Sequence, residues 1–396
     1  MAVDVGRRPF PARSRSAALT DAAVLARHLD WVLLAAVATL VGYGLWAVAG
    51  ITRFDVPGDP DYFVTRQALA VVIGVLGMAV AVAVNPDVYR RHWRLIYGAT
   101  IALMIFVFVF AEAIRGSKRW IDLGPFQFQP SELGKLAFVL ALAGFLVERS
   151  WGVRELRSVV GVVGLAAAPI ALVFLQPDLG TAMVYTAALL AVLFVAGVRW
   201  LHLAVLACLA LLVVLATVWL LPAAGIEVLK PYQTARLTGF TNPDADPGGL
   251  TYNLNQSITA IGAGGLDGRG VEDATQTRLD YLPEHATDFV FASFAEQRGF
   301  FGAAILLLLY LLVVWRGLRV ITVAGDFYGA VVAGGIVFAF AFQVFVNVGM
   351  TMGLAPVTGI PLPFVTVGGS SIVANLLAVG VLQAIHARGN ADVLRR

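Results

Sequence analysis

Three acidic residues before the eighth long apolar stretch are the strongest candidates for chemistry in this 396-residue chain. Glu284 and Asp288 are four residues apart, and Glu296 lies two further such steps along. Pro283 suits the first turn of a helix, so the three carboxylates are expected to approximate one helix face. The chain turns apolar from Phe289, and a carboxylate partly removed from water is a stronger base. Asp288 is therefore predicted to be the catalytic residue.

Helix-terminus electrostatics are the alternative explanation of these acids. A negative charge near a helix N-terminus is stabilising without any catalytic role. This explains Glu284 fully, but it explains Asp288 less well, because Asp288 lies beyond the first turn of the predicted helix. Glu284 is expected to orient the surrounding loop or a metal ion.

Basic residues gather before and inside the fourth apolar stretch. Lys118 and Arg119 adjoin Trp120, and Lys135 lies deeper, three residues after Glu132 and on the same helix face. Arginine and lysine both bind phosphate oxygens, so this cluster suits a lipid-linked anion such as a diphosphate. The alternative is an interfacial belt of snorkelling cations with one structural ion pair.

A short turn separates the fifth and sixth apolar stretches. It contains Pro177 and Asp178 and leaves hardly any loop. Aspartate at such a position accepts hydrogen bonds from the free N–H groups of the next helix. We therefore expect Pro177 and Asp178 to be structural.

The segment 353–371 contains three prolines, among them Pro361 and Pro363, and repeated glycines. It cannot form a continuous helix, and broken backbone at membrane depth is tolerated only where protein buries it or where it lines a cavity. One interpretation is a re-entrant cavity wall with free N–H groups near Gly368 and Ser370 that are available to anions. An ordinary interhelical loop fits equally well.

The elements that must position these residues are membrane helices. Hydrophobic residues make up 59% of the chain and charged residues only 13%, about half the charged fraction of a soluble protein. This composition argues against a soluble enzyme, a disordered chain and a coiled coil. A membrane helix needs about 20 predominantly apolar residues, and ten ranges qualify: 31–50, 67–84, 95–112, 131–147, 158–175, 179–197, 200–221, 300–316, 327–349 and 367–386. The predicted fold is an all-α polytopic membrane protein of ten transmembrane helices.

Basic residues predict the orientation, because cytoplasmic loops are enriched in lysine and arginine. Most of the 28 basic residues fall on the inner side if both termini are cytoplasmic, and no basic run is dense enough to indicate nucleic acid. A large extracytoplasmic loop, folded as a surface lid, is expected between spans 7 and 8. The predicted organisation is a cytoplasmic tail (1–30), spans 1–7 (31–221), the loop with the entry to span 8 (222–299), spans 8–10 (300–386) and a second cytoplasmic tail (387–396).

Together these segments resemble the SEDS family of cell-wall polymerases, and its RodA branch more closely than its FtsW branch. The resemblance extends from the first span to the last, and QTRL at 276–279 favours RodA. Its motifs are KRW at 118–120, QPSEL at 129–133 with Lys135, QPDLG at 176–180, QS at 256–257 with the glycine-rich 262–270, YLPE at 281–284 with TDF at 287–289, and GIPLPF at 359–364 with GGSS at 368–371.

The chain departs from the family pattern at several polar positions. The usual histidine before the Thr-Asp pair is replaced by Ala286, with His285 one place earlier. Thr366 and Val367 replace a Ser-Tyr pair, and the usual acidic pair is Glu296 followed by glutamine. These differences weaken the branch assignment.

The resemblance implies a peptidoglycan glycosyltransferase that polymerises lipid II at the outer face of the bacterial cytoplasmic membrane during cell elongation. It also implies a class B penicillin-binding protein as partner, with other elongation-complex membrane proteins. The family's essential aspartate maps onto Asp288. A divalent cation, Mg²⁺ or Mn²⁺, is a possible cofactor. The residues expected to bind substrate are Lys118, Arg119, Trp120, Glu132, Lys135, Glu284, Thr287, Gly368 and Ser370.

The expected reaction begins when Asp288, as general base, removes the proton from the 4-hydroxyl of the acceptor sugar. That oxygen attacks the anomeric carbon of the growing strand, inverts it and expels polyprenyl diphosphate. Lys118, Arg119 and Lys135 are expected to stabilise the charge on the leaving group. The alternatives are a transporter that flips lipid-linked cell-wall precursors, an FtsW-like division polymerase, and an inactive scaffold.

Overall fold

The computed structural model describes residues 26–111, 119–122, 124, 127–149, 153–223, 225 and 251–393, and almost all regular structure in them is helical. The first helices are α2 (Trp31–Ile51), α3 (Tyr62–Ala83), α4 (Pro86–Arg91) and α5 (Trp93–Phe110). A two-residue hairpin of β1 (Ile121–Asp122) and β2 (Gln127–Phe128) precedes α6 (Pro130–Glu148), α7 (Leu156–Leu175), α8 (Leu179–Val195) and α9 (Trp200–Leu215). A π-helical turn η1 (Ala216–Leu220) and α10 (Leu221–Ala223) extend α9, and the rest comprises α12 (Tyr252–Gly264), α13 (Thr275–Arg278), α14 (Val290–Val323), α15 (Phe327–Thr351) and α16 (Gly369–Val393).

Each of the ten predicted apolar ranges overlaps one of these helices. Eight helices in the described part of the chain are long and apolar enough to cross a membrane. The other two, α8 and α9, have 17 and 16 residues. The helical membrane class is therefore confirmed. Residues 1–25 and 394–396 of the two predicted tails lie outside the described residues, as do Lys118 and residues 226–250 of the predicted loop. Residues 387–393 of the predicted C-terminal tail form the end of α16.

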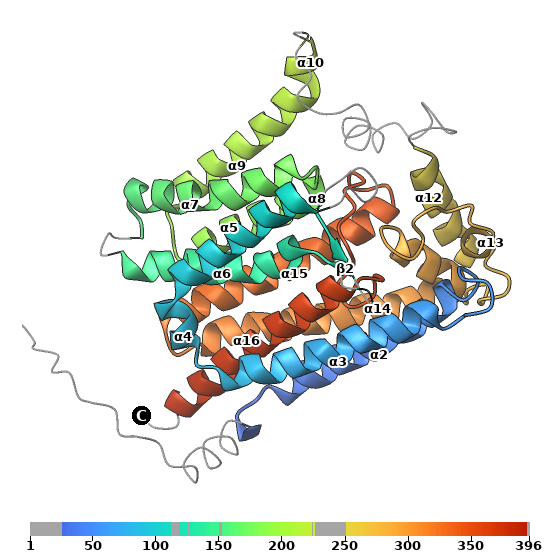
Figure 1. Ribbon diagram of the computed structural model, residues 1–396, viewed down its shortest axis with the longest axis horizontal. Helices are drawn as coiled ribbons and strands as arrows, with labels where there is room; N and C mark the ends of the chain where they lie inside the picture. Colours follow the sequence, from blue (N-terminus) through green and yellow to red (C-terminus); the bar gives the residue numbers. More distant parts are fainter. Residues whose placement is uncertain are drawn as a thin grey trace, which may run out of the picture.

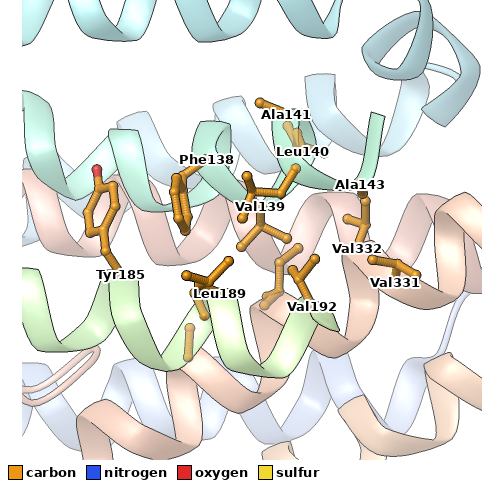
Figure 2. Close-up of a cluster of buried hydrophobic side chains, with 14 of the residues drawn as sticks. Phe138, Val139, Leu140, Ala141, Ala143, Tyr185, Leu189, Val192, Val331 and Val332 are labelled. Carbon is orange, nitrogen blue, oxygen red and sulfur yellow. The ribbon is translucent and has the colours of Figure 1, made fainter. Parts of the chain in front are cut away.

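The centre of the bundle is formed by α6 and α16, and 83% of the most apolar stretch of each of these helices is buried. Large side chains of α6 interlock with those of α8 and α15; Figure 2 shows Phe138 and Val139 facing Tyr185, Leu189 and Val192. Other helices surround this centre, whereas α9 extends away from it (Figure 1). The central helices are thus held by close packing that fixes the polar groups they carry.

The long helix α14 is broken at Gly299, which has φ +63° and ψ −167°. A Cβ at this position would overlap the backbone of Gly268 and Leu266, so the break admits the glycine-rich turn that follows α12. Phe300 donates its N–H to the carbonyl of Gly265 at 2.9 Å. The helix that contains the eighth predicted span, 300–316, therefore begins ten residues earlier than predicted, at Val290.

The described part of the predicted loop is folded. Helices α12 and α13 lie at one end of the bundle, and α4 lies at the opposite end (Figure 1). At the α4 end, Arg316 of α14 makes an ion pair of 2.7 Å with Asp30, which is fully buried and caps α2. Gln383 of α16 exchanges hydrogen bonds of 2.8 and 2.9 Å with the backbone of Asp30. This buried pair joins three helices, and the sequence patterns did not predict it.

Candidate functional site

The segment that carries Asp288 is a series of turns. Residues 282–289 are not helical, Phe289 is the N-cap, and α14 begins at Val290. The predicted helix start at Pro283 is therefore wrong, and Asp288 precedes the helix instead of lying in its second turn. Asp288 is half-buried, as its position at the start of the apolar stretch predicts.

Glu284 does not share a helix face with Asp288. It has a left-handed backbone with φ +56°, and its carboxylate accepts a 2.7 Å hydrogen bond from the hydroxyl of Thr287. The N–H of Thr287 donates to the carbonyl of Glu284 at 3.1 Å. These contacts close a tight turn beside Asp288, which is a local contact of the kind that competes with helix formation.

Glu296, the third acid, has a structural environment. Its side chain is fully buried and accepts hydrogen bonds from the N–H of Gln276 at 2.9 Å and from the N–H and hydroxyl of Thr277 at 3.0 and 2.7 Å. It therefore holds the N-terminus of α13 against α14. The expectation that Glu296 shares a helix face with Asp288 is wrong, because Asp288 precedes α14. The carboxylate of Glu296 is hydrogen-bonded to α13 instead.

We expect Glu296→Gln to loosen α13. A carboxylate accepts all three hydrogen bonds. In glutamine one of the two oxygens becomes an NH₂ group, which cannot accept, so one backbone N–H loses its acceptor. A buried unsatisfied donor costs about 1–3 kcal/mol. Hydrogen exchange at residues 275–278 should accelerate and the melting temperature should fall. Glu272→Gln is the control, because its exposed pair with Arg53 is 3.9 Å long and such pairs contribute little. Equal exchange in the two variants would contradict this role.

The broken segment 353–368 packs directly against Asp288. It is non-helical between α15 and α16 and much of it is buried, and the hydroxyl of Tyr310 donates to the carbonyl of Pro363 at 2.5 Å. Pro361 lies in the same segment. Gly359 has φ +72°, and a Cβ there would lie 3.2 Å from Oδ2 of Asp288. The expected break is confirmed, and one of its glycines makes room for the carboxylate.

Gly359→Ala is expected to impair both stability and activity. A left-handed backbone costs a residue with a Cβ about 1–2 kcal/mol, and the added methyl displaces the Asp288 carboxylate. A contact of 3.2 Å requires the carboxylate to move by a few tenths of an ångström, so the expected loss of rate is smaller than the roughly 10²-fold cost of a full ångström. The melting temperature and the turnover of substrate by the purified variant measure the two effects. Gly262→Ala is the control, because a Cβ on this helical glycine meets nothing within 4 Å; a wild-type rate for Gly359→Ala would exclude close contact with a reacting group.

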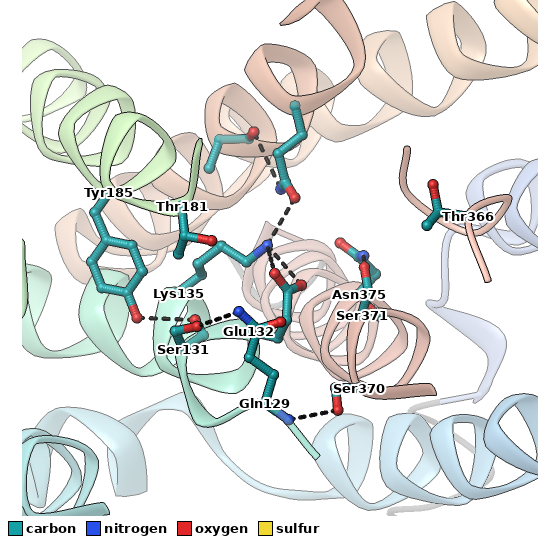
Figure 3. Close-up of polar contacts among 12 residues, drawn as sticks. Gln129, Ser131, Glu132, Lys135, Thr181, Tyr185, Thr366, Ser370, Ser371 and Asn375 are labelled. Atoms are coloured by element: carbon teal, nitrogen blue, oxygen red, sulfur yellow. Dashed lines mark hydrogen bonds and ion pairs between the residues drawn. The ribbon is translucent and has the colours of Figure 1, made fainter. Parts of the chain in front are cut away.

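The ion pair predicted on α6 is present and largely buried. Nζ of Lys135 lies 2.8 Å from Oε2 of Glu132, with side-chain exposures of 11% and 3%. Gln343 of α15 accepts a second hydrogen bond from this ammonium at 2.8 Å. Figure 3 shows the pair opposite Asn375 of α16. These residues line a cavity of about 50 Å³, which has room for water.

Helix α15 brings the cation and the acid together. Gln343 contacts Lys135, and four residues later Asn347 donates from Nδ2 to the carbonyl oxygen of Asp288 at 3.1 Å. Residues four apart lie on one face of a helix, separated by about 6 Å of rise. Neither amide was predicted as a site residue, although polar residues inside an apolar stretch are a recognised indication of function.

Arg119 is paired with an acid in the described structure. Its Nη1 lies 3.2 Å from Oδ2 of Asp178, and Oδ1 of Asp178 accepts from the N–H of Thr181 at 3.0 Å, so the predicted cap of α8 is present. Gln129 also donates to Asp178 at 2.9 Å. Trp120 beside it is half-buried. Both described cations of the predicted anion site, Arg119 and Lys135, are thus held by buried carboxylates.

At the end of the broken segment, the N–H of Gly368 and the hydroxyl of Ser370 both have hydrogen-bond partners. The N–H of Gly368 donates to Oε1 of Gln67 on α3 at 3.1 Å. The hydroxyl of Ser370 donates to the carbonyl of Gln127 at 2.8 Å and accepts from the N–H of Gln129 at 2.9 Å (Figure 3). The prediction of free N–H groups is therefore wrong at Gly368, and Ser370 holds the β2 strand against α16.

His285, in the turn before Asp288, contacts two acids. Its Nε2 lies 3.0 Å from Asp55, in the connection between α2 and α3, and its Nδ1 lies 3.4 Å from Asp280. Burial lowers the pKa of His285, but the hydrogen bond and charge of Asp55, with the charge of Asp280, outweigh burial and raise the pKa above 6.5. The sequence patterns did not predict this link between the α2–α3 connection and the Asp288 segment.

Because folding raises the pKa of His285, the protonated imidazole stabilises the folded chain. This contribution is complete below the unfolded value of 6.5 and is lost as pH rises through the higher folded value. We expect the melting temperature to fall as pH rises from 6.5 through the higher folded pKa of His285, and Asp55→Asn to reduce that fall. Asp59→Asn is the control, because Asp59 is an exposed carboxylate in the same connection and is not one of the groups that raise the pKa of His285. An unchanged pH slope in Asp55→Asn would contradict this role.

The sequence as a whole matches known proteins. The family model for FtsW, RodA and SpoVE, described as "Cell cycle protein", matches residues 27–391. The chain belongs to this SEDS family. SEDS relatives include stage V sporulation protein E of Bacillus subtilis, 37% identical over 89% of this chain and 93% of the relative. The peptidoglycan glycosyltransferase MrdB of Escherichia coli is 35% identical over 91% and 94% of the two chains.

The fold also agrees with solved SEDS structures. A chain of a peptidoglycan synthase complex that coordinates polymerization and crosslinking matches with a TM-score of 0.76 and 31% identity, over 91% of this chain and 98% of that chain. RodA of Thermus thermophilus matches with a TM-score of 0.66 and 29% identity, over 90% of this chain and 96% of that chain.

A probable peptidoglycan glycosyltransferase FtsW of Tolumonas auensis is 37% identical over 92% and 93% of the two chains. Since RodA and FtsW names both occur among the relatives, the family is established and the branch is not.

Proposed function

We propose that this chain is a glycosyltransferase that polymerises peptidoglycan from lipid II. Relatives of similar length are named peptidoglycan glycosyltransferases. One observation carries the proposal. Asn347 and Gln343, on one face of α15, form hydrogen bonds with the half-buried acid Asp288 and with the cation Lys135, respectively. A base beside a preorganised cation is what sugar transfer from a diphosphate requires.

In the proposed reaction, Asp288 takes the proton of the acceptor's 4-hydroxyl as that oxygen forms a bond to the anomeric carbon of the donor. The bond from this carbon to the diphosphate breaks on the opposite side, so the configuration inverts and polyprenyl diphosphate leaves. Lys135 is held in place by Glu132 and Gln343, and a preorganised donor stabilises developing charge without the cost of gathering it from water. Arg119, Trp120, Glu284 and Thr287 surround the site in this proposal.

A metal ion has no assigned step in this reaction. In the described ranges, no group of three or more histidine, cysteine, aspartate or glutamate side chains could hold one. Mg²⁺ commonly binds through one or two carboxylates and the phosphates of its substrate. A role for Mg²⁺ or Mn²⁺ would therefore depend on the lipid diphosphate for most of its ligands.

The setting we propose is the bacterial cytoplasmic membrane, with ten spans, both termini cytoplasmic and the Asp288 segment at the outer face. Ten spans require α8 and α9, with η1, to cross beside the eight longer helices. We propose a RodA-like role in cell elongation with a class B penicillin-binding protein as partner. The similarity to a chain of a peptidoglycan synthase complex supports a partner of this kind.

The deciding experiment gives the purified chain lipid II in detergent, without any partner, and resolves the products by size. The proposal predicts glycan polymer, and the Asp288→Asn chain purified in the same way controls for a contaminating polymerase. In detergent a transporter or a scaffold yields no polymer. The transporter alternative predicts instead that the chain moves labelled lipid-linked precursor across vesicle membranes. Absence of polymer from folded chain would overturn the proposal.

A further inference from the structure

One buried amide joins the two segments that meet at the proposed catalytic acid. Asn347, in the last two turns of α15, has 0% exposure. Its Nδ2 donates to the carbonyl oxygen of Asp288 at 3.1 Å and to that of Ile360 at 2.8 Å. The first carbonyl belongs to the turn before α14, and the second belongs to the broken segment beside Gly359. A single side chain therefore sets the distance between the acid and the glycine that makes room for it.

Asn347 uses only its donors. Its Oδ1 is buried and has no hydrogen-bond partner among the residues that the structure describes. A buried acceptor without a partner is unfavourable, so this oxygen contributes nothing to the fold. Placing the NH₂ toward two carbonyls is the assignment that their hydrogen bonding requires. The feature that distinguishes asparagine from an apolar residue of similar size here is thus the pair of N–H groups.

The hydrogen bond from Asn347 completes a row of three contacts on consecutive carbonyls. The carbonyls of Ala286 and Thr287 accept hydrogen bonds from the end of the broken segment, and the carbonyl of Asp288 accepts one from α15. The three bonds run from the N–H of Val367 to Ala286 at 3.0 Å, from the hydroxyl of Thr366 to Thr287 at 3.1 Å, and from Asn347 to Asp288 at 3.1 Å. Because the backbone of Asp288 is fixed at its carbonyl, its carboxylate projects from a defined point.

We propose that Asn347 is a positioning residue for the glycosyl-transfer reaction, and that it acts by holding the main chain of Asp288. This inference rests on the proposed function of Asp288. Asn347 contacts the backbone of the acid and not its carboxylate, so its loss leaves the base in the molecule but misplaces it. Placement within about 0.5 Å is what a catalytic group needs.

The first test replaces Asn347 with leucine, which has a similar size and no donors. We expect kcat for lipid II polymerisation by the purified chain to fall about 10- to 100-fold, with KM nearly unchanged, because an interaction made only in the transition state is lost. Gln383→Leu is the matched control. Gln383 is also a buried amide bonded to backbone. It is far from the broken segment, because it lies roughly 20 Å along α16 from Gly369, where that helix begins. It should lower stability without lowering kcat.

The second test is Asn347→Asp, which has a readout that a purely structural role would not change. An ionised carboxylate cannot donate to the two carbonyls, whereas a protonated one donates a single hydrogen bond. The ratio of the variant's kcat to that of the wild type should therefore rise as pH is lowered. This variant also keeps the inference testable if Asn347→Leu does not fold.

The outcomes are distinct. If the wild-type chain makes no polymer, the proposed function itself fails, and this inference fails with it. If the wild type polymerises and folded Asn347→Leu has a wild-type kcat, the positioning role alone is wrong. A loss of kcat equal to that in Gln383→Leu, or a ratio for Asn347→Asp that does not vary with pH, would likewise overturn the inference.

Discussion

Asp288→Asn is expected to slow polymerisation by at least about 10²-fold while the chain remains folded. Asparagine has nearly the same shape but cannot accept a proton, and general-base catalysis contributes about 10²–10⁴-fold. The backbone contact of Asp288 with Asn347 does not depend on the carboxylate and should persist. Polymer formed by equal amounts of folded wild-type and variant chain measures the effect.

The control for this variant is Asp280→Asn, which removes an exposed carboxylate eight residues earlier in the chain. It changes the charge near His285 but not the proposed base, so its rate should stay close to that of the wild type. A comparable loss of rate in both variants would indicate a general charge effect. Retention of the wild-type rate by Asp288→Asn would remove Asp288 from the catalytic role.

The largest effect on stability is expected from breaking the buried pair of Glu132 and Lys135. Lys135→Met leaves the Glu132 carboxylate buried without its charge partner, and removing one partner of a buried pair costs about 3–5 kcal/mol. The double replacement Glu132→Gln with Lys135→Met removes both charges, so it should regain most of that stability. It should not regain activity, because the cation that we propose to stabilise the leaving diphosphate is still missing. Thermal unfolding and polymer formation measured on the same samples separate the two quantities.

The second buried pair, Asp30 and Arg316, supplies a matched control at the other end of the bundle. Arg316→Met should destabilise the chain to a similar extent. The double replacement Asp30→Asn with Arg316→Met should recover stability, since asparagine also caps a helix, and it should recover activity too. If both double replacements polymerise lipid II equally, Lys135 has only a structural role.

Local patterns predicted part of the site. The cap of α8 by Asp178 and the interruption at 353–368 depend on residues adjacent in sequence. Glycine and proline exclude a helix, and an aspartate before a helix binds its free N–H groups, whatever surrounds them. The pair of Glu132 and Lys135 follows in the same way from a spacing of three on one helix face.

The rest of the site depends on contacts between distant parts of the chain. A helix beginning at Pro283 is locally reasonable, but the carbonyls of the following turn are bound by Thr366 and Asn347, which fixes a non-helical path. The N–H of Gly368 is taken by Gln67, 301 residues away in sequence. Propensity is a weak guide where tertiary contacts override it, and none of these pairings is visible in a single sequence.

The most direct test of the central claim, that the Asp288 carboxylate is the base, is the pH dependence of kcat/KM for lipid II polymerisation. For the wild type we predict an acidic limb in which the rate falls tenfold per pH unit as the base becomes protonated. The residual rate of Asp288→Asn should be low and flat over the same range. An acidic limb of the same shape in Asp288→Asn would contradict the account, because another group would then be the base.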